Sequence, residues 1–168
     1  PAEPNKDGVE TTSYLYAYYF IARKLAELER KDLLSAVSKQ FNTHLYTPNA
    51  TPELPEIINC GPIDYYNHMP YVFNNSRIIL ITSLRSIRSG IPLRAMDIMG
   101  CNGFLLANYQ ADFFDFFVPG EDMAVFESKE DLINKCDYYL EHDNERRQIA
   151  ANGFGKVNEF HTYKVRLK

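Results

Sequence analysis

The residues of this sequence that could carry out chemistry are concentrated between Ser83 and Gln110. Within that stretch Arg94 and Asp97 are three residues apart, so a helix would place both side chains on one face. A carboxylate can accept two hydrogen bonds from a vicinal diol, and a guanidinium can pair with a diphosphate through parallel N–H groups. The pair therefore predicts a site for a ligand that carries both groups. An ordinary surface ion pair is the alternative interpretation at this spacing.

A short helix is expected to hold this pair. Gly90 interrupts the chain, and Pro92 suits the first turn of a helix because its missing N–H needs no partner there. The apolar pattern then continues over 93–99, and Gly100 is expected to end the helix in a left-handed conformation. Arg85, which precedes this helix, is the next basic candidate for a diphosphate, although it could equally be a solvated loop charge, as could Arg88.

A strand and a polar turn follow the helix. The apolar run 103–107 predicts a buried strand, and the turn Asn108, Tyr109 and Gln110 leads into a second helix at Ala111. A strand, a tight turn and a helix in that order are the arrangement in which open α/β sheets present backbone N–H groups to a phosphate. The turn is therefore a candidate phosphate contact. The alternative is that Asn108 stabilises the turn and contacts no ligand.

The remainder of the chain predicts an α/β domain. Five short apolar segments read as strands, at 43–47, 56–60, 77–82, 103–107 and 123–126. Helices are expected over 14–39 (capped by Ser13 and bent near 30–32), 65–74, 93–99 and 111–117. A capping box at Ser128 is expected to open a helix that runs to Glu141, and Asp143 to cap another that leads to Gly153. Strands that alternate with helices favour a Rossmann-like parallel sheet of five strands with helices on both faces.

Composition narrows the class of protein. A chain of 168 residues with 45% hydrophobic residues can form one domain with a real core, and its net charge of −4 gives no reason to expect nucleic acid as a partner. Residues 1–12 are expected to be a linker or a frayed end, and 13–168 the domain. The longest apolar run, 14–22, is too short for a transmembrane segment. Because the chain begins at Pro1 without Met, we expect it to be a piece of a longer protein.

The three cysteines have no metal-ligand spacing and predict no metal site. Cys60, Cys101 and Cys136 are few, odd in number and widely separated. This usage is typical of reduced core thiols in a cytoplasmic protein.

Four blocks of sequence resemble a known family. They are NCGPIDYY (59–66), SLRSIRSGIPLRAMDIMGCNGFLLANYQ (83–110), VPGEDMAVFES (118–128) and the series DYYLEH, ERRQIAANG and HTY between 137 and 163. In this order they resemble bacterial glycosyltransferases of the spore maturation protein B type, within the glycosyltransferase group 1 superfamily. The resemblance implies a GT-B fold, which has two Rossmann-like domains. This chain resembles the C-terminal half, which binds the nucleotide-sugar donor.

The resemblance also implies roles for individual residues. Asp97 falls where the family holds the ribose hydroxyls of the donor, although the usual residue there is Glu. Gly61, Pro62 and Tyr65 match the stretch that lines the base pocket. Arg94 is then expected, together with Arg85, to neutralise the diphosphate.

The turn formed by Asn108, Tyr109 and Gln110 matches the place where backbone amides meet the phosphates. Many retaining members carry an acidic residue eight positions before the ribose-binding one. Here that position is Ser89, which leaves the stereochemical outcome of the reaction open.

The implied function is binding of a nucleotide diphosphate sugar for transfer to an unknown acceptor, with no metal or other cofactor. The partner would be the missing N-terminal GT-B domain, which is expected to supply the acceptor site and the catalytic base, so this chain alone should be inactive. His161 is expected to be structural instead of catalytic. Two other classes remain: a degenerate Rossmann-like domain without ligand, and a receiver- or flavodoxin-like binding module, although a receiver's acidic cluster is missing after the segments at 43–47 and 78–82.

Overall fold

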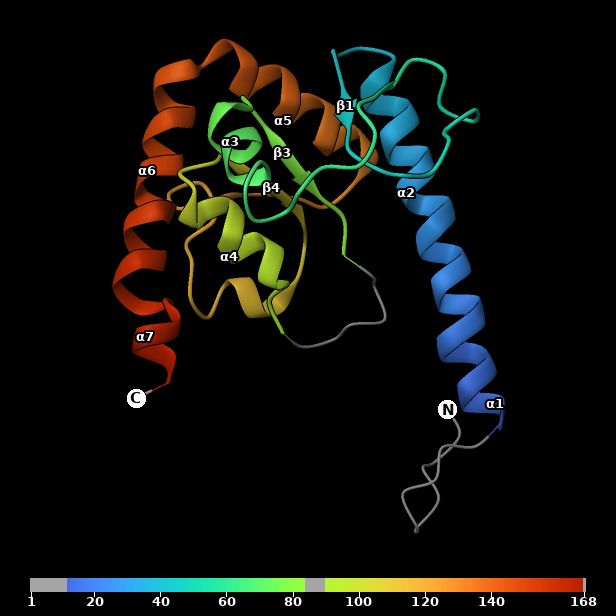
Figure 1. Cartoon of the computed structure of the whole chain (residues 1–168), viewed down its shortest axis with the longest axis horizontal. Coiled ribbons are helices and arrows are strands. Elements are labelled where there is room, and N and C mark those ends of the chain that lie inside the picture. Colours follow the sequence, from blue (N-terminus) through green and yellow to red (C-terminus); the bar gives the residue numbers. More distant parts are fainter. Residues whose placement is uncertain (1–11, 84–89, 168) are drawn as a thin grey trace.

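A computed structural model of the chain describes residues 12–83 and 90–167, in which helices surround short parallel strands (Figure 1). The strands are β1 (His44–Leu45), β2 (Ile58–Asn59), β3 (Ile79–Ile81), β4 (Leu105–Asn108) and β5 (Ala124–Phe126). The α-helices are α1 (Thr12–Leu15), α2 (Ala22–Ser38), α3 (Met69–Asn75), α4 (Leu93–Gly100), α5 (Lys129–Glu141), α6 (Asp143–Phe160) and α7 (Tyr163–Arg166). A π-helix, η1 (Tyr16–Ile21), joins α1 to α2, and a 3-10 helix, η2 (Ala111–Phe113), follows β4.

The strands form two parallel sheets instead of one. All five occur where the sequence predicts them, but β1 pairs with β2, while β3, β4 and β5 form a separate sheet in that order. The prediction of a single five-stranded sheet is therefore wrong. β1 and β2 are two residues long, and both residues of β2 are exposed, so this pair has neither the hydrogen bonds nor the apolar face needed to extend the larger sheet.

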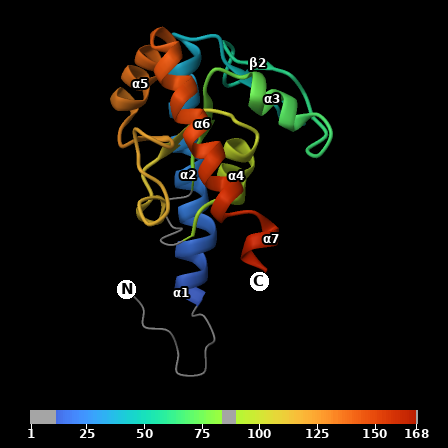
Figure 2. The ribbon, with the colours of Figure 1, turned by 90° about the vertical axis from the view of Figure 1, so that its left-hand side faces the viewer.

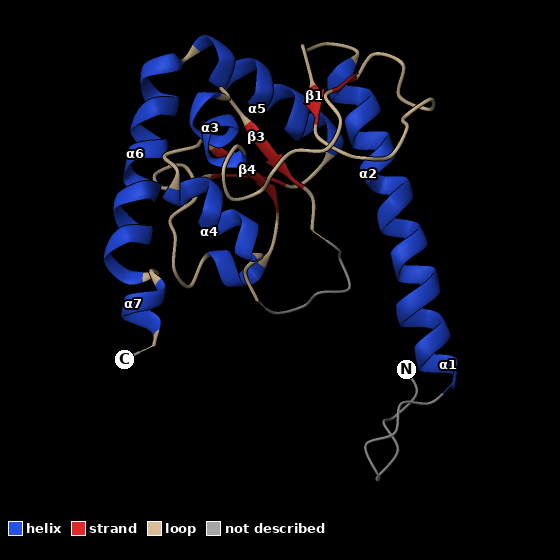
Figure 3. Cartoon of the chain, in the orientation of Figure 1, coloured by secondary structure: helices blue, strands red, loops and turns tan. Residues whose placement is uncertain are grey.

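Helices cover the three-stranded sheet on both faces, as predicted, and successive strand side chains point to opposite faces. Figure 3 shows its strands lying among the helices. One face, with Ile79, Leu105 and Val125, packs against α3, α4 and the later part of α6. The other face, with Leu80, Leu106 and Ala124, packs against α5, the end of α2 and the earlier part of α6. The side view in Figure 2 shows α6 between α5 and α4, consistent with its contribution to both cores.

The first helix differs from its prediction in two features, its N-terminal cap and its bend. Helical structure begins at Thr12, so Ser13 lies inside α1 and does not cap it. The expected bend near 30–32 is absent because α2 is continuous over Ala22–Ser38, and the irregularity is the π-helix η1. Both ribbon views show the beginning of this helix projecting away from the rest of the described chain (Figures 1 and 2), and Tyr16, Phe20 and Ile21 are accordingly exposed.

Two further helix ends move for local reasons. The helix predicted from Tyr65 begins at Met69 instead, because the carboxylate of Asp64 accepts the amides of Tyr66 and Asn67 in a turn before it. Gly100 is the last residue of α4, and the left-handed conformation falls on Asn102, at φ 59°.

The helices that follow β4 agree only in part with their predicted ranges. The predicted aromatic helix over 111–117 is only η2. Ser128 caps α5 by accepting the amide of Asp131 at 3.1 Å, as predicted. Asp143 is the first residue of α6, and that helix passes through Gly153 to Phe160.

The buried thiol prediction holds only for one cysteine. Cys136 is buried in the core, and its burial raises the thiol pKa to about 11. Cys101 is half-buried, and Cys60 is exposed, with its Sγ 3.5 Å from His44 Nδ1. The prediction of a core thiol is wrong for Cys60, because this residue directly follows β2, which lies at the surface.

His161 anchors the short helix α7 to the domain. Its Nδ1 lies 2.6 Å from Arg166 Nη2, and because a guanidinium can only donate, the imidazole accepts in its neutral form. Its ring packs edge-on against Phe116 and tilted against Phe117. Burial lowers the pKa of His161, and the charges of Arg166 and Lys156 lower it further. The arrangement supports the predicted structural role.

Acidification is expected to loosen α7. Because the pKa of His161 is lower in the folded state, the unfolded chain takes up a proton first as the pH falls below the ordinary value of 6.5. The stabilisation is therefore complete above pH 6.5 and decreases toward the lowered pKa. The protection factors of the α7 amides, which are exchange rates corrected for the intrinsic effect of pH, should fall more between pH 7 and pH 5 in the natural chain than in His161→Gln, which does not titrate. The exposed His68→Gln is the control, and equal changes in all three chains would contradict the assignment.

Candidate functional site

Three of the predicted site residues meet at one point on the surface. The hydroxyl of Tyr65 donates a hydrogen bond of 2.5 Å to Asp97 Oδ2. The guanidinium carbon of Arg94 lies over the ring of the same tyrosine, 5.5 Å from its centroid. Asp97 and Arg94 are exposed and Tyr65 is half-buried, so a ligand can reach this cluster.

The fold determines this meeting. Arg94 and Asp97 lie on α4, whose apolar residues Ala95, Ile98 and Met99 are completely buried and leave the polar face outward. Tyr65 comes from the turn that follows β2. Burial and the hydrogen bond to Asp97 raise the pKa of the Tyr65 hydroxyl, which therefore remains a donor at neutral pH.

The other predicted base-pocket residues lie in the turn just before Tyr65. Gly61 has φ +74°, and its amide donates to Asn59 Oδ1 at 2.9 Å, while Pro62 is exposed. Among the described residues no hydrogen bond joins Gly61 or Pro62 to the cluster, so their role stays a prediction. Arg85, like Arg88 and Ser89, lies outside the described residues.

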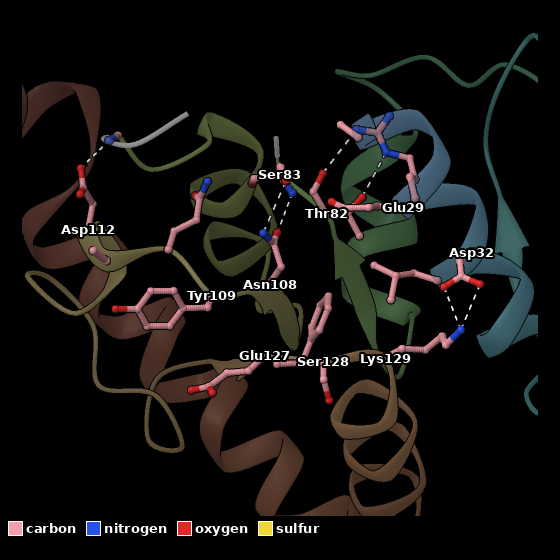
Figure 4. A pocket seen from close by; sticks show the side chains of 17 residues that line it. Glu29, Asp32, Thr82, Ser83, Asn108, Tyr109, Asp112, Glu127, Ser128 and Lys129 are labelled. Carbon is pink, nitrogen blue, oxygen red and sulfur yellow. Dashed lines mark hydrogen bonds and ion pairs between the residues drawn. The ribbon is translucent and has the colours of Figure 1, made fainter. Parts of the chain in front are cut away.

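A cavity of about 800 Å³ opens at the carboxyl edge of the three-stranded sheet (Figure 4). Parallel strands end at the same edge, so the segments that follow β3, β4 and β5 come together there. α2 forms the facing wall. The lining consists of Thr82 and Ser83, Gly90, residues 108–112, residues 126–129, and Ala26, Glu29, Arg30, Asp32 and Leu33 of α2.

Hydrogen bonds at this edge already occupy part of the predicted phosphate turn. Asn108 Oδ1 accepts the amide of Ser83 at 2.6 Å, so its side chain fixes the exit of β3 (Figure 4). The amide of Tyr109 donates to the carbonyl of Phe126 at 2.9 Å and extends the pairing of β4 with β5. Both groups therefore serve the fold in this structure, and the phosphate contacts of this turn stay a prediction.

The charged side chains that line the cavity are mainly acidic. Four of the described lining residues are acidic and two are basic. Lys129 Nζ contacts the carboxylate of Asp32 at 2.9 and 3.1 Å, and Arg30 donates to Thr82 at 3.1 and 3.4 Å. Within the described lining, both cations are thus already engaged by the protein.

Gln110 is the unusual residue of the cavity. Only 8% of it is exposed, and among the described residues its Oε1 has no hydrogen-bond partner. Buried polar side-chain atoms nearly always have a partner, so this oxygen is an exception among the described residues.

The structure therefore places six of the nine predicted residues in two groups: Tyr65, Arg94 and Asp97 in the surface cluster, and Asn108, Tyr109 and Gln110 in the cavity. The other polar lining residues were not among the predicted site residues. Thr82 and Glu127 directly follow strands, so the rule of carboxyl edges could have indicated them. The α2 residues gave no such signal, because helical periodicity does not tell which edge of a sheet a helix will face.

No group of three potential metal ligands occurs within residues 12–83 and 90–167. Of the helices that the structure describes, none is long and apolar enough to cross a membrane.

The comparisons with known proteins define the class. The profile of the glycosyl transferase-like family matches residues 23–168, and the chain belongs to this family. None of the curated proteins matches the chain significantly.

Two solved structures share its fold. One is the C-terminal domain of the glycosyl transferase group 1 family protein LpcC from Francisella tularensis, with a TM-score of 0.64, 20% identity and 80% of each chain covered. The other is HepE from Anabaena in complex with UDP and glucose, with a TM-score of 0.60 and 13% identity over 80% of this chain. The present chain spans 41% of the HepE chain. The predicted α/β fold is thus confirmed, and the narrower spore maturation type stays a prediction.

Proposed function

We propose that this chain is the donor-binding domain of a glycosyltransferase and binds a nucleotide diphosphate sugar. The observation that carries the proposal is the convergence of Tyr65, Arg94 and Asp97 beside the start of α4. Family membership and the fold of the LpcC domain support it. The complex of HepE with UDP and glucose makes a uridine nucleotide the first ligand to test.

The nucleoside would lie at this cluster. Asp97 uses only Oδ2 for Tyr65, so its second oxygen can accept a ribose hydroxyl. The ring of Tyr65 offers an apolar surface to the base. The first amides of α4 and the guanidinium of Arg94 supply positive charge for the diphosphate.

These groups favour a leaving nucleoside diphosphate without a metal. Negative charge grows on the diphosphate as the sugar departs, and fixed N–H donors and a guanidinium stabilise that charge. We assign acceptor binding and the catalytic base to a second domain, so this chain alone should bind the donor and transfer little or nothing. Location in the cytoplasm is part of the same proposal.

The test is the thermal stability of the 168-residue chain with UDP, GDP, ADP, TDP and CDP. A ligand at a hundred times its Kd adds about 2.7 kcal/mol of stability, which raises the Tm of a domain of this size by about 5–10 °C. We expect one nucleotide to give such a shift and the others to give less, which would identify the base.

The corresponding nucleosides are the control, because they lack the diphosphate that Arg94 and α4 are proposed to bind. Shifts from nucleosides as large as those from nucleotides would contradict the phosphate assignment. If no nucleotide stabilises the chain at millimolar concentration, the degenerate domain without ligand becomes the better interpretation.

A further inference from the structure

We infer that Cys60 is a nucleophilic thiol, activated by His44 and Tyr46, that hydroperoxides oxidise to a sulfenic acid. These three side chains belong neither to the lining of the cavity nor to the surface cluster of Tyr65. The inference goes beyond the proposed function and does not depend on it, because the reaction needs no nucleotide.

The pairing of β1 with β2 brings the three side chains to one face. The register pairs His44 with Ile58. The amide of Cys60 donates to the carbonyl of Leu45 at 2.9 Å, so the parallel ladder continues past the end of β2. Side chains two residues apart on a strand share a face. Tyr46 and Cys60 therefore lie beside each other where the two strands end, with His44 next to them.

His44 can take the proton of the Cys60 thiol. Its Nδ1 lies 3.5 Å from Cys60 Sγ, and both side chains are exposed. In the tautomer that carries its proton on Nε2, Nδ1 is an acceptor for the S–H group. The thiolate is the reactive form of cysteine, and an imidazole in contact with a thiol is an arrangement that generates it.

Tyr46 supplies a hydrogen bond that favours the thiolate. Burial raises the pKa of its phenol, and the charge of the Cys60 sulfur and a hydrogen bond to it raise that pKa further. The hydroxyl therefore stays protonated at neutral pH and donates to the sulfur. A hydrogen bond to the charged form of a group stabilises that form.

The environments of the two other cysteines suppress their reactivity. Cys136 is buried, and burial raises the pKa of its thiol to about 11. Cys101 is half-buried, and its burial and the charge of Asp97 raise the pKa of its thiol. Both thiols are therefore protonated and shielded at neutral pH, whereas a reagent in solution can reach Cys60.

A thiol beside an imidazole also occurs at metal sites. Zinc takes three or four protein ligands. In the part of the chain that the structure describes, no third His, Cys, Asp or Glu completes such a group. The cluster therefore suits chemistry at the sulfur better than metal binding.

The reaction is an attack of the sulfur on the O–O bond of the hydroperoxide. His44 Nδ1 takes the thiol proton, and the thiolate attacks one oxygen. The S–O bond forms as the O–O bond breaks, and the leaving hydroxide or alkoxide takes the proton from the imidazolium. The sulfur of Cys60 is oxidised by two electrons to a sulfenic acid, and the hydroperoxide is reduced to water and, where it is organic, an alcohol.

The experiment treats the 168-residue chain with hydrogen peroxide at pH 7 and traps sulfenic acid with dimedone. Peptide mass spectrometry then measures the labelling rate of each cysteine. We expect Cys60 to be labelled about tenfold faster than Cys101 and Cys136, since a thiol without a base is only slightly ionised at this pH. It should exceed by a similar factor the rate of a free peptide of residues 59–63, which lacks His44 and Tyr46.

His44→Gln tests the base, because an amide cannot take up a proton. It should slow the labelling of Cys60 by about tenfold at pH 7. At about pH 10, where thiols ionise without a base, it should match the natural chain, a convergence that a merely steric role of His44 would not produce. Tyr46→Phe retains the ring and should slow the labelling a few-fold. His142→Gln, whose imidazole stacks on Tyr138, is the control and should leave the rate unchanged.

Cys60→Ser retains the size of the side chain and should remove the main label without lowering the Tm. The inference is overturned if Cys60 reacts no faster than the free peptide, if His44→Gln keeps the natural rate at pH 7, or if the label persists in Cys60→Ser. Since no nucleotide takes part in the measurement, its failure is distinguishable from failure of the proposed function.

Discussion

Replacing Asp97 by alanine is expected to weaken nucleotide binding by about 10–100-fold, because it removes charge-assisted hydrogen bonds worth about 1.5–3 kcal/mol. The carboxylate is the acceptor that we assign to the ribose hydroxyls, and Tyr65 uses only one of its oxygens. Titration calorimetry with the nucleotide chosen by the thermal panel measures the loss. Since Asp97 is exposed, the fold itself should lose little stability.

Tyr65→Phe is the matched control. It removes the hydroxyl that binds Asp97 Oδ2 but retains the ring beneath Arg94. Because both carboxylate oxygens then become available, nucleotide affinity should stay within a few-fold of the natural value. Equal losses in Asp97→Ala and Tyr65→Phe would show that the pair matters only as a structural contact. Unchanged binding in Asp97→Ala would place the ribose elsewhere.

Gly153→Ala is expected to destabilise the fold strongly. An added Cβ would lie 2.4 Å from the carbonyl oxygen of Asp122 and 3.3 Å from Met99 Sδ. Asp122 is itself held in place, since its carboxylate accepts the amide of Val118 at 2.7 Å and contacts Lys156. Overpacking against a fixed backbone should cost about 2–3 kcal/mol and lower the Tm by about 5–10 °C.

Gly155→Ala provides the opposite result within the same helix. No described atom outside its local backbone lies within 4 Å of a Cβ built there. In a helix interior, alanine is favoured over glycine by about 0.5–1 kcal/mol, so the Tm should rise slightly. Thermal unfolding of both variants checks the pair. Equal losses would mean that the end of α6 is intolerant of any substitution, and no loss in Gly153→Ala would contradict the close packing of α6 on the loop before β5.

Gly153 also illustrates what the sequence could not reveal. A glycine at this position is typical of a helix end, yet α6 continues to Phe160. Glycine is required there because the backbone of Asp122, which is distant in the sequence, lies too close for a Cβ. Patterns of neighbouring residues predicted the features that short-range interactions determine. The apolar runs located all five strands, and Ser128 capped α5 as expected. The division into two sheets depends on pairing between distant strands, which no local pattern encodes.

The candidate site shows the same limit. Spacing placed Arg94 and Asp97 on one helix face, and the structure added Tyr65 to them. The polar turn after β4 was located correctly as a segment. Its Asn108 side chain and Tyr109 amide nevertheless bond to Ser83 and Phe126, because the groups at a sheet edge first satisfy one another.

Two kinds of contact hold the part of α2 that lines the cavity. Leu33 and Val37 of this helix pack on the core, while Arg30 and Asp32 reach the sheet edge through exposed polar contacts with Thr82 and Lys129. Dissolved ions screen exposed charge pairs and leave apolar packing in place. Added salt is therefore expected to weaken the ion pair between Asp32 and Lys129, while the apolar contacts of Leu33 and Val37 with the core persist.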